Sequence, residues 1–149
     1  LWWIAMVHDY ALWRDDPAFV AEQMPAVRSV AETFRACIGE SGAVHRPAGW
    51  NFVDWVPQWS NGISPGIPEA PCGVLTWHFI MTLRLKAELE RAFGDSRFAD
   101  RDAADAVRLR DTAMELFYDT DRGLLAEDPG RTCFTERSFF IDCMNLPGS

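Results

Sequence analysis

Aromatic side chains and one carboxylate are concentrated in a short segment whose residue types suit sugar binding. Trp50, Phe52, Asp54 and Trp55 lie close together in the chain, and Trp59 follows four residues after Trp55. Large rings can stack on the apolar face of a pyranose, and a carboxylate can accept hydrogen bonds from its hydroxyl groups. We therefore predict that Trp50, Asp54, Trp55 and Trp59 bind a carbohydrate.

The same side chains also have a purely structural explanation. Large aromatic residues are mostly buried in proteins, so the three tryptophans would anchor a long loop to the core while Asp54 caps a turn. Two other classes of protein therefore stay open beside an enzyme. One is a non-catalytic carbohydrate-binding domain, and the other is a helical interaction module in which these rings are buried.

The aromatic segment lies in a long region that lacks helical periodicity. Residues 39–73 contain six glycines, five prolines and three tryptophans. A loop of this length inside a compact domain is uncommon and is usually functional. Within it, residues 43–45 and 52–53 are predicted to form a short strand pair.

The remainder of the chain shows the spacing of amphipathic helices. Residues 1–14 contain no glycine or proline, and Trp2, Trp3 and Trp13 are predicted to face the core. Asp16 and Pro17 have the residue types of an N-cap and a first helical position. The helix that follows is predicted to end at Gly39. Its apolar stripe is Val20, Met24, Val27, Ala31, Phe34 and Ile38.

A second pair of helices is predicted after the loop. One begins at about residue 74, with two apolar faces near its start, and Gly94-Asp95-Ser96 connects it to an antiparallel neighbour. The second helix of the pair is expected to turn Arg101, Asp105, Arg108 and Asp111 outward. Asp119 to Gly123 is predicted to be a turn and not a calcium loop, because the later EF-hand ligands do not match. A last apolar run covers residues 139–144.

Composition limits the classes of partner and cofactor. The chain has 149 residues and a net charge of −8, without a basic stripe, so nucleic acid and membrane surfaces are not expected partners. Three histidines and four cysteines are scattered without metal-ligand spacing, so no metal or other cofactor is expected. The cysteines are predicted to be buried free thiols, which favours the cytoplasm; a single disulfide is the alternative.

Several of these motifs together resemble one enzyme family. The run Trp50-Asn51-Phe52-Val53-Asp54-Trp55, the preceding Asp-Asp-Pro turn and the later segment from Leu116 to Leu124 are similar to the catalytic domain of bacterial α-L-rhamnosidases. The resemblance implies an all-α fold of antiparallel helical hairpins, part of an (α/α)6 barrel of the six-hairpin glycosidase type. It also implies hydrolysis of terminal α-L-rhamnosides with inversion, without a cofactor.

The resemblance gives roles to particular residues and leaves others unassigned. Trp50 and Trp55 would form walls of the sugar pocket, and Asp54 would accept a hydroxyl hydrogen bond. Inverting hydrolysis needs an acid and a base, two carboxyl groups roughly 6.5–9.5 Å apart. The family's motifs for these two groups do not occur in this sequence.

The number of predicted helices indicates that the chain is a piece of something larger. A barrel of six hairpins needs twelve helices, and the sequence predicts about five. We therefore expect residues 1–149 to be a single domain that is a fragment of a larger (α/α)6 catalytic domain, inactive alone. An open slice of a barrel exposes apolar helix faces, so we also expect self-association.

Overall fold

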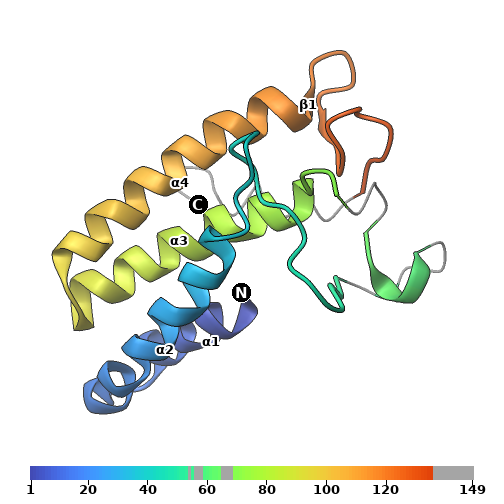
Figure 1. The fold of residues 1–149 in the computed structure, drawn as a ribbon. Helices are drawn as coiled ribbons and strands as arrows, with labels where there is room; N and C mark the ends of the chain where they lie inside the picture. The colour runs from blue at the N-terminus through green and yellow to red at the C-terminus, as the bar shows by residue number, and fades with distance from the viewer. Residues whose placement is uncertain (54, 56–58, 65–68, 136–149) are drawn as a thin grey trace.

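The described part of the protein is built mainly from four α-helices, arranged as Figure 1 shows. The computed structural model describes residues 1–53, 55, 59–64 and 69–135. In chain order, the elements of this part are α1 (Trp2–Trp13), α2 (Pro17–Arg35), the short 3-10 helix η1 (Ser60–Gly62), α3 (Gly73–Phe93), α4 (Ser96–Phe117), β1 (Tyr118–Asp119) and β2 (Leu124–Leu125). The predicted apolar run at 139–144 lies outside the described residues.

The first two helices confirm the predicted pair of helices, separated by a short turn, at the start of the chain. Asp16 is the N-cap of α2, where its carboxylate accepts a 3.1 Å hydrogen bond from the amide of Phe19, and Pro17 occupies the first helical position. The helix continues through Pro25. The first four positions of the predicted stripe, from Val20 to Ala31, are buried against the rest of the core.

The end of α2 and the predicted strand pair both differ from expectation. The helix ends at Arg35, before Gly39, because the next residues pair with the returning chain: Ile38 bridges Val44, and the amide of His45 donates to the carbonyl of Cys37 at 2.9 Å. Residues 43–45 therefore pair with residues 37–39, just after α2, and His45 also bridges Pro71. The expected pairing with residues 52–53 is wrong.

Helices α3 and α4 form a tight antiparallel hairpin, as predicted (Figure 1). Only Gly94 and Asp95 separate them, and the Asp95 carboxylate accepts a 2.9 Å hydrogen bond from the amide of Arg97 to cap α4. Helix α3 is the centre of the fold, since α1, α2 and α4 all pack against it. Its buried apolar side chains include Trp77, Phe79, Leu83 and Leu89.

The segment after α4 is a tight turn flanked by two very short strands. Tyr118 pairs with Leu125 and Asp119 with Leu124, and the Asp119 carboxylate accepts hydrogen bonds of 3.0 Å from the amides of Asp121 and Arg122. This confirms the predicted turn. Within the described residues, no group of three or more acidic, histidine or cysteine side chains is arranged to hold a metal ion.

Two predictions about burial are wrong. Trp2, Trp3 and Trp13 are not buried in the core; all three side chains are exposed to different degrees, although the ring of Trp2 also packs on His78 of α3. Their position in an apolar helical run does not show which of them another element covers. Among the cysteines, Cys72 is buried as expected, whereas Cys37 and Cys133 are half-buried; these three are free thiols.

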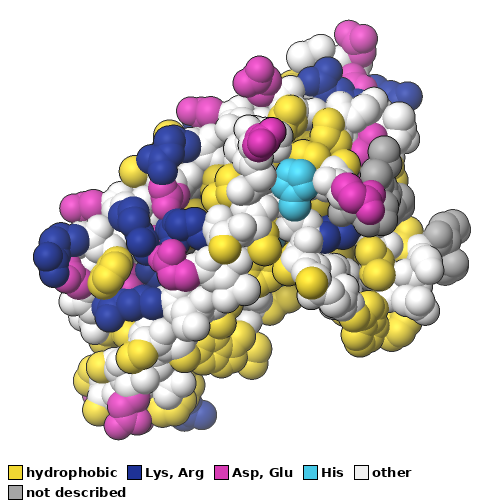
Figure 2. Space-filling model, viewed as in Figure 1, with side chains coloured by type: hydrophobic (Ala, Val, Ile, Leu, Met, Phe, Trp, Pro, Cys, Tyr) yellow, Lys and Arg dark blue, Asp and Glu magenta, His cyan; other side chains and the backbone are white. Residues whose placement is uncertain are grey.

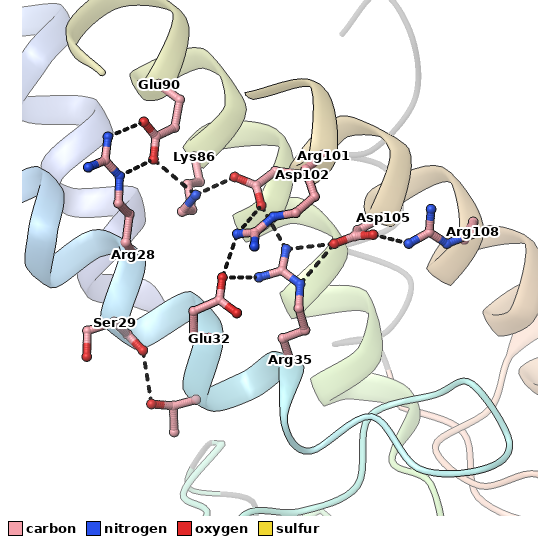
Figure 3. Close-up of polar contacts among 11 residues, drawn as sticks. Arg28, Ser29, Glu32, Arg35, Lys86, Glu90, Arg101, Asp102, Asp105 and Arg108 are labelled. Atoms are coloured by element: carbon pink, nitrogen blue, oxygen red, sulfur yellow. Dashed lines mark hydrogen bonds and ion pairs between the residues drawn. The ribbon is translucent and has the colours of Figure 1, made fainter. Parts of the chain in front are cut away.

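A set of charged side chains joins α2 to the α3–α4 hairpin (Figure 3). We call Arg28, Arg35, Lys86, Glu90, Asp102 and Asp105 the charge network. Lys86, Glu90 and Asp102 are fully buried. Arg28 donates two hydrogen bonds to the Glu90 carboxylate, at 2.8 and 2.7 Å. Lys86 donates to the carboxylates of both Glu90 and Asp102. Arg35 forms an ion pair with Asp102 at 2.7 Å. Each buried charge thus meets at least one opposite charge, and Glu32, Arg101 and Arg108 extend the ion pairs towards the surface.

The charge network corrects the predicted orientation of α4. Asp105 does not face outward: it is buried and accepts a 2.9 Å hydrogen bond from Nε of Arg35. The ring of Phe98 covers the other end of the network, with the guanidinium carbon of Arg28 at 4.7 Å from the ring centre. The charged residues Arg28 and Arg35 therefore determine how α2 packs against the α3–α4 hairpin.

None of the helices in the described part of the chain is both long and apolar enough to cross a membrane.

Replacing Lys86 by methionine tests the energetic role of the charge network. The substitution keeps the volume of the side chain but leaves Glu90 and Asp102 buried without their shared cation. Breaking a buried pair in this way costs about 3–5 kcal/mol, which urea denaturation would measure as a lower free energy of unfolding. Arg97→Ala is the control, because its pair with Asp95 is exposed and should contribute at most about 1 kcal/mol. Equal small losses in both variants would contradict this role.

The carboxylate of Glu90 predicts a dependence of stability on pH. Burial alone would raise its pKa, but hydrogen bonds from Arg28, the amide of Asp95 and Lys86 outweigh burial and lower the pKa from 4.5 to about 2. The folded state therefore gains stability from this group above pH 4.5 and loses it as the pH falls towards 2. Glu90→Gln should lower the free energy of unfolding at pH 7, and the difference from the native chain should shrink steadily in acid. A constant difference across this range would contradict the assignment.

Candidate functional site

The region between α2 and α3 carries the predicted sugar-binding residues and is anchored at both ends. Besides the bridges near Val44 and Pro71, Nδ1 of His45 lies 2.8 Å from the carbonyl of Glu69. Arg46 donates from Nη2 to the carbonyl of Ser64 at 3.0 Å and to its hydroxyl at 3.2 Å. These contacts therefore hold the first and last segments of the loop together at its base.

Three aromatic rings lie in contact at the far end of this loop. We call Trp50, Phe52 and Trp55 the aromatic cluster; they are 65%, 42% and 73% exposed, respectively. The ring centres of Trp50 and Phe52 are 5.4 Å apart and those of Phe52 and Trp55 are 5.1 Å apart, in tilted arrangements. Figure 2 shows hydrophobic side chains gathered on the lobe that this loop forms. Packing in the core is therefore not the role of Trp50 and Trp55.

Backbone hydrogen bonds hold the aromatic cluster in place. Nε1 of Trp50 donates to the carbonyl of Asn61 at 2.9 Å, and the amide of Val53 donates to the carbonyl of Gly62 at 2.8 Å. Asn61 and Gly62 both have positive φ, at 52° and 71°, a conformation that these two residue types adopt most readily. The chain can therefore turn sharply at this point, and a hydrogen bond at its edge fixes the indole of Trp50 while most of the side chain stays exposed.

The structure brings together only part of the predicted site. Trp50 and Trp55 are linked through Phe52, which the predicted set of site residues did not include, although it lies only two residues after Trp50. Trp59 is half-buried. Asp54 lies outside the described residues, so its predicted role as a hydroxyl acceptor stays a prediction.

A second group of polar contacts, which the sequence-based prediction did not include, fixes the start of α3, where the long loop ends. The buried Glu127 carboxylate accepts a 3.2 Å hydrogen bond from the amide of Val74 and another hydrogen bond from the hydroxyl of Thr135. Gly73 is needed here because a Cβ would lie 2.3 Å from the carbonyl oxygen of Ala126. The start of α3 is thus fixed to the segment after α4.

Next to this group, Cys72 precedes the first residue of α3. Its sulfur lies 3.6 Å from the hydroxyl of Ser64, and burial raises the pKa of the thiol. A raised pKa keeps the sulfur protonated at neutral pH, so it is unsuited to nucleophilic chemistry. Its place in the core and its contact with Ser64 make it part of the loop's anchor.

The buried histidines do not extend the site. Burial, together with the positive charge of the N-terminus, lowers the pKa of His78 to about 3, so it is neutral at physiological pH. Its ring centre lies 4.5 Å from that of Trp2. His8 is also buried, and its Nε2 lies 2.8 Å from the carboxylate of Glu88. Both histidines pack α1 against α3 and lie on helices, not on the loop.

The aromatic cluster can offer exposed apolar ring surface to a ligand. Rings of this kind bind surfaces that are apolar on one side and hydroxylated at the edge. The described side chains of the cluster contain no proton donor or acceptor suited to acid–base chemistry. The arrangement therefore suits binding and orientation of a ligand.

Comparisons with known proteins identify the fold. No family model matches the chain, and no curated protein matches its sequence. Among solved structures, the chain is similar to the crystal structure of a GH78 family rhamnosidase of Bacillus sp. GL1, with a TM-score of 0.72 and 24% sequence identity. The match covers 95% of this chain and 16% of that chain.

This likeness confirms the predicted fold class. The chain is all-α, built from antiparallel helical hairpins of the kind that form part of the (α/α)6 domain in the GH78 rhamnosidase. Because the sequences are only 24% identical, the likeness establishes the fold and not the activity.

The exposure of the aromatic cluster predicts a small energetic role in folding. Trp55→Ala should lower the free energy of unfolding by less than about 1 kcal/mol, because little apolar surface is lost from the core. The matched control is Trp77→Ala, in which a fully buried indole is removed at a cost of about 3–5 kcal/mol. Urea denaturation measures both. A loss of several kcal/mol for Trp55→Ala would restore the explanation that this ring is a core anchor.

Proposed function

We propose that this chain is part of the catalytic domain of an α-L-rhamnosidase-like glycoside hydrolase and that the aromatic cluster lines its sugar-binding site. The observation that carries the proposal is a set of exposed rings, in mutual contact, on a loop that is anchored at its base. Exposed aromatic clusters usually mark binding surfaces. The likeness of fold to a GH78 rhamnosidase supports the choice of a carbohydrate as ligand.

Each residue of the proposed site has a distinct role. Trp50 and Trp55 stack against the apolar face of the sugar, and Phe52 holds the two indoles apart. Asp54 accepts hydrogen bonds from sugar hydroxyls, and Trp59 forms part of the pocket wall. The whole protein would hydrolyse terminal α-L-rhamnosides with inversion, without a metal or other cofactor.

The acid and the base of the reaction would come from other parts of a longer polypeptide. Inversion requires two carboxyl groups roughly 6.5–9.5 Å apart, one to protonate the leaving oxygen and one to activate water. This sequence lacks the family's motifs for both, and the matched rhamnosidase is several times longer than this chain. We therefore propose that residues 1–149 are one segment of a larger catalytic domain, which binds sugar but does not turn it over alone.

Hydrolysis of a panel of aryl glycosides by the longest native chain containing this segment tests the proposal. We expect turnover of the α-L-rhamnoside in preference to the other sugars. Trp55→Ala and Asp54→Asn should lower kcat/KM by about tenfold or more, which corresponds to about 1.4 kcal/mol of transition-state binding. Trp13→Ala is the matched control, since this indole is even more exposed than that of Trp55 but lies on α1.

Binding measured in parallel separates the remaining outcomes. If no sugar is hydrolysed but L-rhamnose changes the tryptophan fluorescence, and Trp55→Ala abolishes that change, the chain belongs to a non-catalytic carbohydrate-binding domain. If the folded protein neither hydrolyses nor binds any sugar, the aromatic cluster has another role and the proposed function is wrong.

A further inference from the structure

A crevice lies between the C-terminal end of α2, with the turn that follows it, and the second half of α4. We call it the α2–α4 crevice. Its volume is about 300 Å³, at the lower end of the range for pockets that hold small molecules. Nε of Arg35 on one side donates to Asp105 on the other at 2.9 Å, and a Cβ at Gly42 would lie 3.4 Å from the hydroxyl oxygen of Thr112. The crevice is therefore an opening between segments that pack against each other within this chain.

The α2–α4 crevice has an apolar base and a cationic rim. Leu109 is only 4% exposed, and Ile38 is packed partly buried against the core. Arg108, which also lines the crevice, has a side chain that is 72% exposed. Glu40 and Asp111, the acidic residues next to these segments in sequence, do not line it. An apolar base beside an exposed cation suits a molecule with an apolar body and a negatively charged head.

The ion pairs beside the crevice contain one more cation than carboxylates. Figure 3 shows Arg108 at the end of a row of charged side chains, where it pairs with Asp105. Asp105 already accepts from Nε and Nη2 of Arg35, at 2.9 and 2.7 Å. The row has five cations, Arg28, Arg35, Lys86, Arg101 and Arg108, and four carboxylates, Glu32, Glu90, Asp102 and Asp105. Because the buried cation requires carboxylate partners, the surplus positive charge falls on the exposed Arg108.

Two hydrogen-bond donors are available at the crevice. Thr112 lies one turn after Arg108, so both side chains come from the same face of α4. Within the part of the chain that the structure describes, neither the hydroxyl of Thr112 nor Nε of Arg108 has a hydrogen-bond partner. A guanidinium and a hydroxyl group can together donate to the oxygens of one carboxylate or phosphate.

We propose that the α2–α4 crevice binds a small organic anion. Its carboxylate or phosphate head accepts hydrogen bonds from Arg108 and Thr112, and its apolar body covers Leu109 and Ile38. The two heads share the oxyanion chemistry that guanidinium groups recognise. This inference does not depend on the proposed sugar binding, because no residue of the aromatic cluster lines the crevice.

Isothermal titration calorimetry of the native chain with four small anions tests the proposal. Benzoate and phenyl phosphate carry a head and a ring, whereas acetate and inorganic phosphate carry the head alone. We expect saturable one-to-one binding of a ring-bearing anion, at least about tenfold tighter than that of the matching head, because the ring covers the apolar base. The tighter of the two ring-bearing anions identifies the preferred head as a carboxylate or a phosphate.

Two variants and a matched control locate the binding site. Arg108→Gln should weaken binding of the ring-bearing anion at least about tenfold and Thr112→Val about fivefold, because each removes a donor. The control is Arg110→Gln, which should change the affinity by less than about twofold. Arg110 is also exposed on α4 and pairs with the adjacent Asp111, but it does not line the crevice. Since both arginines are exposed, circular dichroism should show unchanged helix content.

Three results would each overturn the proposal. The first is a native chain that shows saturable binding of none of the four anions, or the same affinity for an anion with and without its ring. The second is equal weakening by Arg108→Gln and Arg110→Gln, which would indicate attraction to the general surface charge. The third is loss of anion binding in Trp55→Ala, which would place the anion at the aromatic cluster.

Discussion

The burial of full charges between three helices is the constraint on which the rest of the structure depends. Lys86, Glu90 and Asp102 have no access to water, so every charge must meet an opposite charge within hydrogen-bond distance. Arg28 and Arg35 of α2 complete these pairs, and α2 can therefore take only one rotation and one height against the hairpin. The connection between α3 and α4 obeys the same constraint, since a Cβ at Gly94 would lie 2.1 Å from a carboxylate oxygen of Glu90.

The two ends of α3 have different tasks as a result. Near its C-terminal end the charge network fixes the packing of α2 and α4. At its N-terminal end, Glu127 and Gly73 join the helix to the segment after α4, and Cys72 contacts the base of the long loop through Ser64. The aromatic cluster therefore projects from a loop whose base is attached to a rigid helix. Binding groups commonly occupy loops that a rigid scaffold positions in this way.

Local signals in the sequence predict most of the fold. Asp16 with Pro17, and the short connection at Gly94, determine helix boundaries within a few residues of the chain, so both helical hairpins can be predicted. The exposure of Trp2 and Trp13 cannot, because periodicity shows that residues share a face but not whether another element covers it. The burial of Asp105 cannot be predicted from the sequence for a similar reason, because its partner Arg35 is 70 residues away in the chain. At the candidate site, the aromatic composition predicts Trp50 and Trp55, whereas the support from Glu127 depends on a distant contact.

The mutual pairing of the buried charges has an evolutionary consequence. Replacing one of its members by an apolar residue leaves an opposite charge without a partner, whereas replacing a matched cation and anion together restores balance. Related sequences should therefore drift at these positions in pairs that link α2, α3 and α4. An apolar residue at the place of Lys86 should accompany an uncharged one at the place of Asp102 or Glu90. Such correlated replacement would record the contact between these helices even where the rest of the sequence has diverged.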